Sequence, residues 1–412
     1  MDIINLEITN FRSFSSSGNR KPLVFRKGIN TIVGENNVGK SSILKALDLV
    51  TRAYNPSDED FHKSETDLPI SISLKVKLHE EELSQIIAKV LKDEINSQVV
   101  KQIVNDMGYI AVYHYLVSVN SSNSPTIDVR FEEMRQKHPG ASDPESSRLH
   151  SIEEKALPFL LNELALKIKV FAEVRKRPGG KNQRLLESLD GASVADVLYC
   201  LKNGNAPQRA KFGLVKSEFK KLFPKLSLEV MNGQDGNPVV MVEKECIKHE
   251  VSIERVGAGI GEIITLITNM IASDNMVFGL DAPELHLHPQ AQRLLLTMLE
   301  EYSKNNQFII VTHSPIFLDT QKLENVIVAR DNEGATCFAQ LPDNCFNEEE
   351  KQKLQRYLDA FNKEFFFSRS VFVVEGETEL GALPIFAGSL NIDFDCSGMS
   401  LVRTGKHFLA CL

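Results

Sequence analysis

The chain has 412 residues, of which 42% are hydrophobic and 25% charged, and its 47 Lys and Arg against 55 Asp and Glu give a formal net charge of −8. The length indicates two or three domains. The composition is that of a globular protein and excludes a disordered or fibrous protein. The acidic balance excludes a uniformly basic nucleic-acid coat but allows a local basic groove. No apolar run approaches the roughly 20 residues of a membrane span, and the acidic first residues are unlike a signal peptide. The six cysteines are scattered and show no disulfide pattern. These features together predict a cytoplasmic protein with no membrane partner.

The amino-terminal part of the chain alternates between predicted strands and helices, as judged from hydrophobic periodicity and from Gly and Pro positions. The expected strands are residues 3–11, 28–33, 70–78, 109–119, 126–133 and 167–175. The expected helices are residues 39–52, 80–105 and 151–167.

The carboxyl-terminal part begins with predicted antiparallel strands at 226–254. From residue 257 onward, helices alternate with apolar strands at 276–280 and 308–311, which indicates an α/β sheet. A charged helix at 347–363 then leads to a last βαβ unit that begins at Ser370. We therefore expect a main domain at 1–345 with an insertion at about 80–165, a helical linker at 346–368, and a partial domain at 369–412.

A phosphate-binding loop is the strongest motif. Residues 34–41 match G-x-x-x-x-G-K-[ST] at every fixed position, between an apolar strand and a helix. Glycines allow backbone N–H groups to close around phosphate, Lys40 would reach the β- and γ-phosphates, and the Ser41 hydroxyl would be a ligand of Mg²⁺. A plain glycine turn is the alternative, which this context disfavours. The expected nucleotide-binding residues are Gly34, Glu35, Asn36, Asn37, Val38, Gly39, Lys40, Ser41 and Ser42.

Two other predicted strands end in residues that could act on a nucleotide bound at this loop. Asp281 follows the apolar strand 276–280, where an acid completes the Mg²⁺ shell. His313 follows the strand 308–311 and would either sense the γ-phosphate or cap a turn. With Lys40 and Asp281 present, the sensor interpretation is the better one.

A second glycine-rich segment, with Gly257, Gly259 and Gly261, precedes an apolar helix and predicts another anion cradle. One triphosphate does not need two cradles within one chain. Two chains related by a two-fold axis would need them, if each contributed this segment to the other's nucleotide. A flexible glycine turn is the alternative.

These motifs have a family resemblance. ITNFRSF, GENNVGKSS, VGAGIGE, LDAPELHLHP and VTHSPIF occur in this order over residues 1–340. They resemble the ABC-type ATPase heads of the RecF/SMC group, and most closely the overcoming-lysogenization-defect (OLD) family of ATPase–Toprim nucleases. The resemblance implies an α/β fold, an ABC-type P-loop ATPase head with a mixed sheet and an antiparallel subdomain. It also implies that residues 257–262 stand for the ABC signature, that His313 is the switch histidine, and that two heads dimerise around ATP.

One position departs from the family pattern. The family usually has Asp-Glu-Pro-Glu after this strand, and the first Glu polarises the attacking water, whereas this chain has Ala282 between Asp281 and Pro283. Alanine has no oxygen to orient or deprotonate water, and Glu284 is not expected to reach the same point. We therefore predict ATP binding and dimerisation with little hydrolysis, whether Ala282 is natural or engineered.

The segment 371–379, VFVVEGETE, resembles the first strand of a Toprim domain. Glu375 and Glu379 match its metal-binding acids, and such carboxylates can hold a divalent cation beside a scissile phosphate. Acids that merely cap a helix are the alternative. The resemblance implies that a full Toprim site also has an Asp-x-Asp from a later strand. Asp393 and Asp395 have this spacing but precede the next expected strand, so we do not assign them to the site. The site therefore looks half present, and we expect that cleavage needs residues beyond Leu412.

A basic loop is the candidate DNA contact, although a merely solvated loop is an equally good interpretation. Its residues are Arg175, Lys176, Arg177, Lys181 and Arg184.

Together these features predict an ATP-binding, dimerising ATPase of an OLD-like system that regulates a Toprim-type DNA endonuclease, with a role in phage defence implied by the resemblance. The expected cofactors are ATP and Mg²⁺, with a second divalent metal at the Toprim acids. The expected partners are a second copy of the chain, in a dimer or a higher oligomer, DNA, and a separate effector protein. Two alternatives stay open: a nuclease-dead ATPase scaffold that holds and releases an effector, and a RecF-like DNA-repair clamp.

Overall fold

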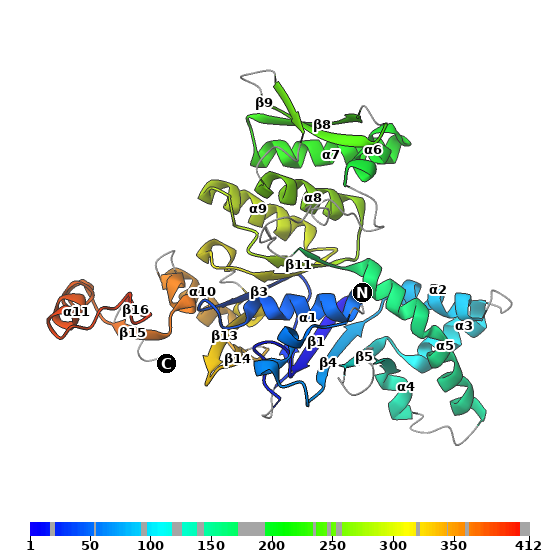
Figure 1. Ribbon diagram of the computed structural model, residues 1–412, viewed down its shortest axis with the longest axis horizontal. Coiled ribbons are helices and arrows are strands. Elements are labelled where there is room, and N and C mark those ends of the chain that lie inside the picture. The colour runs from blue at the N-terminus through cyan, green and yellow to red at the C-terminus, as the bar shows by residue number, and fades with distance from the viewer. Residues whose placement is uncertain are drawn as a thin grey trace.

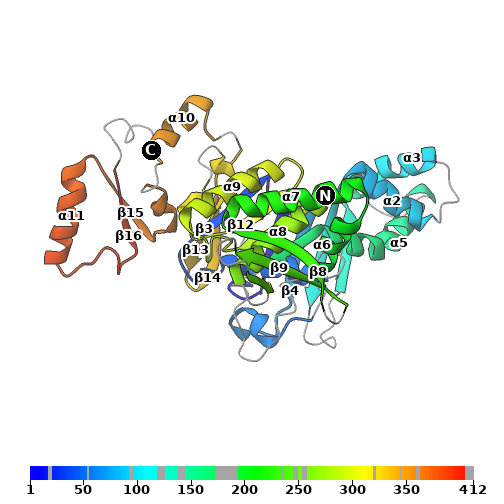
Figure 2. The same cartoon turned by 90° about the horizontal axis from the view of Figure 1, so that it is seen from above.

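The computed structural model describes most of the chain. The described residues are 1–16, 21–52, 55–91, 97–117, 126–137, 144–171, 194–233, 236–244, 249–252, 258–318, 322–343, 345–358 and 362–403. Figures 1 and 2 show a layered head, with a small carboxyl-terminal part that extends from one side of it in both views.

A six-stranded sheet forms the centre of the head, in the order β14-β13-β3-β12-β11-β7. Its strands are parallel except β14, which pairs antiparallel with β13 at one edge. Their bounds are β3 Ile29–Gly34, β7 Ile168–Phe171, β11 Val277–Asp281, β12 Gln307–Val311, β13 Val326–Asn332 and β14 Ala335–Gln340. This mixed sheet confirms the predicted fold class.

Side chains on the central strands alternate between two cores, because successive residues of a strand point to opposite faces. Val277, Ile309 and Val311 belong to one cluster, whereas Phe278 and Phe308 belong to the other. All five side chains are buried. The sheet is therefore covered on both faces, as a largely parallel sheet requires.

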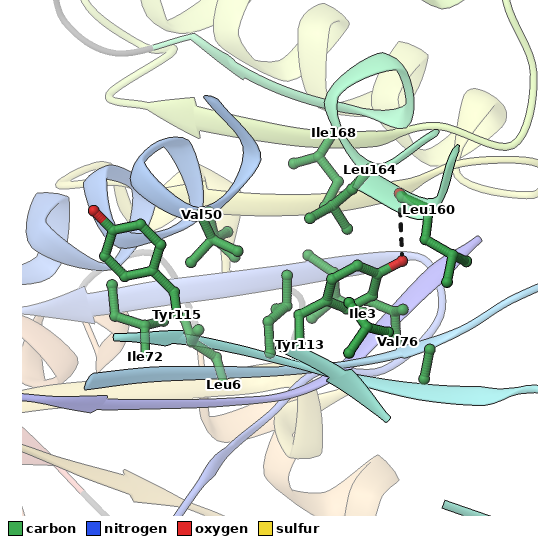
Figure 3. Packing of buried hydrophobic residues seen from close by; sticks show 14 of the residues in the cluster. Ile3, Leu6, Val50, Ile72, Val76, Tyr113, Tyr115, Leu160, Leu164 and Ile168 are labelled. Carbon is green, nitrogen blue, oxygen red and sulfur yellow. Dashed lines mark hydrogen bonds between the residues drawn. The ribbon is translucent and has the colours of Figure 1, made fainter. Parts of the chain in front are cut away.

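The first core lies between the central sheet and a second, antiparallel sheet of order β2-β1-β4-β5-β6. Figure 3 shows this packing, with Tyr113 and Tyr115 of the sheet close to Val50 of α1 and Leu160 of α5. The Tyr113 hydroxyl donates to the Leu160 carbonyl, 3.5 Å away, so the buried phenol keeps a partner. The bounds are β1 Asp2–Thr9, β2 Leu23–Val24, β4 Ile70–Lys77, β5 Ile110–Val117, β6 Thr126–Phe131, α1 Lys40–Arg52 and α5 Pro144–Lys167.

The predicted insertion at 80–165 shares this core. Its strands β5 and β6 extend the sheet of β1, and its helices pack into the same cluster. The single helix expected over 80–105 is wrong, because the structure has α2 (Glu80–Val90) and α3 (Ser97–Met107) there. A short α4 (Glu132–Lys137) follows β6.

Helices α8 (Ala258–Ala272) and α9 (Pro289–Tyr302) cover the other face of the central sheet. Beyond them lie two helices and the antiparallel sheet β10-β9-β8 (Figure 1). The hydrophobic pattern predicts neither helix, although Asn205 and Gln208 form a capping box at the start of the second. The bounds are α6 Val194–Asn203, α7 Ala206–Leu222, β8 Leu226–Asn232, β9 Pro238–Lys244 and β10 His249–Ser252.

The carboxyl-terminal part has the expected βαβ unit, in which β15 (Ser370–Val374) pairs in parallel with β16 (Met399–Arg403) and α11 (Glu377–Ser389) connects them. The preceding linker is not one helix, because α10 ends at Tyr357 and a separate 3₁₀ segment, η7, follows. α10 spans Glu348–Tyr357 and η7 spans Asn362–Phe367. In the described part of the chain, no helix combines the length and the apolar character that a membrane span requires.

Candidate nucleotide-binding site

The phosphate-binding loop connects the end of β3 to the start of α1. Gly34 and Gly39 have φ angles of 140° and 91°, where an L side chain is strained. A Cβ at Gly34 would lie 2.1 Å from the Ala329 carbonyl oxygen, and one at Gly39 would lie 2.0 Å from Ser13 Oγ. Both glycines are therefore required by close packing as well as by backbone angle.

Lys40 is the first residue of α1 and is 4% exposed. Its ammonium donates to the carbonyls of Gly34, 2.9 Å away, and of Glu35. Burial lowers the Lys40 pKa to about 8, although Asp281 and Glu35 favour the charged form. A buried ammonium that bonds the loop's own backbone is held where phosphate oxygens would approach.

Ser41 and Asp281 come together across the sheet, although they are 240 residues apart in sequence. The Ser41 hydroxyl donates to Asp281 Oδ1 over 3.0 Å. They meet because β3 and β11 both neighbour β12 in parallel, so their carboxyl ends lie at one edge. Two hard oxygen donors beside a phosphate loop fit Mg²⁺. The described His, Cys, Asp and Glu side chains form no group of three or more that could hold a metal ion, so the rest of such a shell would come from phosphate and water.

Ala282 and Glu284 follow Asp281 in a tight turn, in which the Leu285 N–H donates to the Ala282 carbonyl over 3.0 Å. Ala282 has a left-handed φ of 50° and is half-buried. The turn returns Glu284 to the end of β12, where its Oε1 accepts the His313 N–H over 2.7 Å. Burial raises the Glu284 pKa above its usual range. The sequence alone does not predict this contact of Glu284, since it depends on the strand order.

The glycine segment differs in one respect from its prediction. Gly257 lies outside the described residues, and Gly259 and Gly261 are in the first turn of α8 rather than in a loop before it. A Cβ at Gly259 would lie 2.9 Å from His286 Cβ, which explains the glycine there. N–H groups in a first helical turn lack helix partners, so this segment can still face an anion.

The two acids predicted as Toprim metal ligands belong to the carboxyl-terminal βαβ unit and not to the phosphate loop. Glu375 follows β15 directly, and Glu379 is in the first turn of α11; both are exposed. Asp393 and Asp395 lie before β16, and the Cys396 N–H donates to Asp393 over 2.8 Å. Because β15 and β16 are parallel, these aspartates lie at the opposite edge from Glu375. The basic loop with Arg175, Lys176, Arg177, Lys181 and Arg184 lies outside the described residues.

The shifted pKa of Lys40 predicts a pH effect on nucleotide binding. In the free protein, Lys40 loses its proton as pH rises through about 8, whereas bound phosphate favours the protonated form. Affinity for ATP should therefore fall about tenfold from pH 7 to pH 9, in titrations with a fluorescent ATP analogue. Lys40→Arg keeps its charge over this range and should show no such fall. An equal loss of affinity in both proteins would contradict the prediction.

Three segments of the chain match known protein families. Residues 1–190 match the family described as AAA ATPase domain, and residues 212–319 match an AAA domain family associated with AbiEii toxin and type IV toxin–antitoxin systems. Residues 366–412 match the family described as overcoming lysogenization defect protein-like, Toprim domain.

Individual relatives extend these matches. An OLD nuclease of Thermus scotoductus is 31% identical over 134 residues, which cover 31% of this chain and 25% of that protein. Endonuclease GajA of Bacillus cereus is 22% identical over 100% of this chain and 73% of its own length. An Smc head bound to the C-terminal winged-helix domain of ScpA has a TM-score of 0.53 at 15% identity, over 83% of this chain and 99% of its own. That structure supports the fold alone.

Proposed function

We propose that this chain, which is an ATPase–Toprim protein of the OLD family, binds ATP with Mg²⁺ at the head and uses nucleotide state to control a Toprim-type DNA endonuclease. This proposal rests mainly on one observation, which is that Lys40, Ser41 and Asp281 lie together at one edge of the central sheet. Lys40 and the loop N–H groups would hold the phosphates, and Ser41 with Asp281 would hold Mg²⁺. Bound Mg²⁺ would supply charge neutralisation at the phosphates.

The linker supports a connection between the two parts. The aromatic side chains of η7 pack against a cluster that includes Val33, immediately before the phosphate loop, and Leu318, beyond His313. Lys363 donates to the Leu318 carbonyl over 2.8 Å. Arg369, immediately before β15, forms an ion pair with Glu35 of the phosphate loop, with 3.9 Å between Arg369 Nε and Glu35 Oε2. That exposed ion pair contributes little stability by itself, so the partly buried aromatic contact is the stronger link.

Dimerisation around ATP is also part of this proposal. The first turn of α8 would face the nucleotide of the partner, because one chain supplies more anion-binding backbone than one triphosphate needs. Light scattering should show the mass of a dimer with ATP and Mg²⁺, and of a monomer without nucleotide. A mass that is independent of nucleotide would contradict this arrangement.

The nuclease half of the proposal concerns the acids at β15. If the protein nicks plasmid DNA with Mn²⁺, Glu375→Ala should abolish that nicking, because this carboxylate lies at the strand end where a metal would sit. Glu377→Ala is the matched control, since Glu377 is an acid of the same turn that is already paired with Arg403. If both variants nick plasmid DNA as fast as the unmodified protein, Glu375 is not part of the nuclease site.

A second function is favoured by Ala282 and by the position of Asp393 and Asp395 at the opposite edge from Glu375. In this alternative, the chain is a cytoplasmic, nuclease-dead scaffold that releases an effector protein when nucleotide binds. Complete absence of nicking by the unmodified protein, with an effector captured only in one nucleotide state, would favour the scaffold.

A further inference from the structure

Two loops leave the same edge of the central sheet side by side. β11 and β12 pair in parallel with Asp281 opposite Val311, so residues 282–288 and 312–318 begin next to each other. The Ala282 N–H donates to the Val311 carbonyl over 2.8 Å, which continues this pairing by one residue. The first loop follows Asp281, the acid proposed to bind Mg²⁺, and the second loop contains His313.

Glu284 makes the first side-chain connection between these loops. Its side chain reaches from the first loop and accepts the backbone N–H of His313 over 2.7 Å. Glu284 is 8% exposed, and the Thr312 side chain also hydrogen bonds to its carboxylate. Burying a carboxylate costs free energy unless it is hydrogen-bonded, and two of its partners, His313 and Thr312, belong to the second loop. The Glu284 side chain therefore fastens the first loop to the second.

Gln292 of α9 makes the second connection. Its Nε2 donates to the carbonyls of Glu284 and Leu287, over 3.4 and 3.0 Å. Its Oε1 accepts the Ser314 hydroxyl over 2.8 Å. One amide thus binds both loops, and the two connections reach adjacent residues, His313 and Ser314.

We propose that Glu284 and Gln292 are positioning residues that hold the His313 loop against the Asp281 loop, so that the two loops respond to nucleotide as one unit. The inference rests on the proposed function, in that the head must bind ATP. Neither residue has to touch the nucleotide. Glu284 acts through the backbone N–H of His313, and Gln292 acts through the hydroxyl of Ser314. Together they fix the position of the backbone from which the His313 side chain extends.

The test compares Glu284→Ala and Gln292→Ala with Glu284→Gln. Glutamine retains an oxygen that can accept the His313 N–H, so it should behave like the parent if the hydrogen bond is what matters. Amide hydrogen exchange is measured over residues 312–318 with and without ATP, and ATP affinity is measured separately. We expect ATP to slow this exchange in the parent and in Glu284→Gln. We expect that protection to be lost in both alanine variants, while their ATP affinity stays within about threefold of the parent.

Catalysis provides a second readout. In an Ala282→Glu background, the alanine variants should lower kcat for phosphate release roughly tenfold with little change in KM, and Glu284→Gln should restore it. ATP protection that is equal in all variants would overturn the proposal, as would an ATP affinity that falls together with the protection. If the parent itself does not bind ATP, the proposed function fails first, and the affinity measurement identifies that outcome.

Discussion

Lys40→Met should remove ATP binding. The Lys40 ammonium is buried among the carbonyls of the phosphate loop, and methionine fills a similar volume without a donor or a charge. A charge-assisted hydrogen bond in such a site contributes up to about 3 kcal/mol, so we expect roughly 100-fold weaker binding or more. Equilibrium titration with a fluorescent ATP analogue measures this directly.

The matched control for this change is Lys27→Met. Lys27 is an exposed lysine before β3, so its replacement makes the same change in net charge without touching the loop. It should bind ATP as the parent does. If Lys40→Met kept the parent's affinity, the loop would be a structural turn and the proposed nucleotide site would be wrong.

Ala282→Glu should turn a slow or inactive ATPase into a faster one. The family resemblance implies a water-polarising carboxylate at this position, where the alanine side chain has no oxygen. A positioned general base contributes 10²- to 10⁴-fold, so phosphate release should rise by roughly 100-fold or more. Ala282 is half-buried and already has a left-handed φ of 50°, so a longer side chain adds little backbone strain.

Ala282→Gln separates chemistry from shape, since glutamine matches the size of glutamate but cannot take a proton. It should release phosphate at about the rate of the parent, while binding ATP equally well. If the unmodified protein already hydrolyses ATP as fast as Ala282→Glu, a different residue serves as the base. Glu284 would then be the first to test, because it is a buried carboxylate at the same sheet edge.

Local sequence predicted the phosphate loop well. A strand, a glycine-rich turn and a helix are contiguous in the chain, and their geometry depends on backbone angles that glycine positions reveal. The same holds for the βαβ unit at the carboxyl end, whose two strands are each a short apolar run. The central α/β sheet followed from the alternation of helices and strands.

Other elements were harder to predict for physical reasons. The helix expected at 80–105 is two helices, α2 and α3, although the apolar periodicity of the sequence runs over both. Helix α7 has an explicit start signal in Asn205 and Gln208, which hydrogen bond to each other's backbone, and attention to capping would have found it. Strand β2 has only two residues, too few for a pattern.

The sequence by itself determined the class of this protein, because its motifs are short and each sets its own local backbone and chemistry. The motifs placed Asp281 with the phosphate loop, whereas only the tertiary structure decided which other distant groups meet. Ser13 covers Gly39, Thr336 donates to the Val38 carbonyl over 2.7 Å, and Glu284 bonds to His313. The physical reason is the order of the strands: β3, β12 and β11 are neighbours in space but far apart in the chain, and their pairing brings all their carboxyl ends to one edge. No local pattern carries that information.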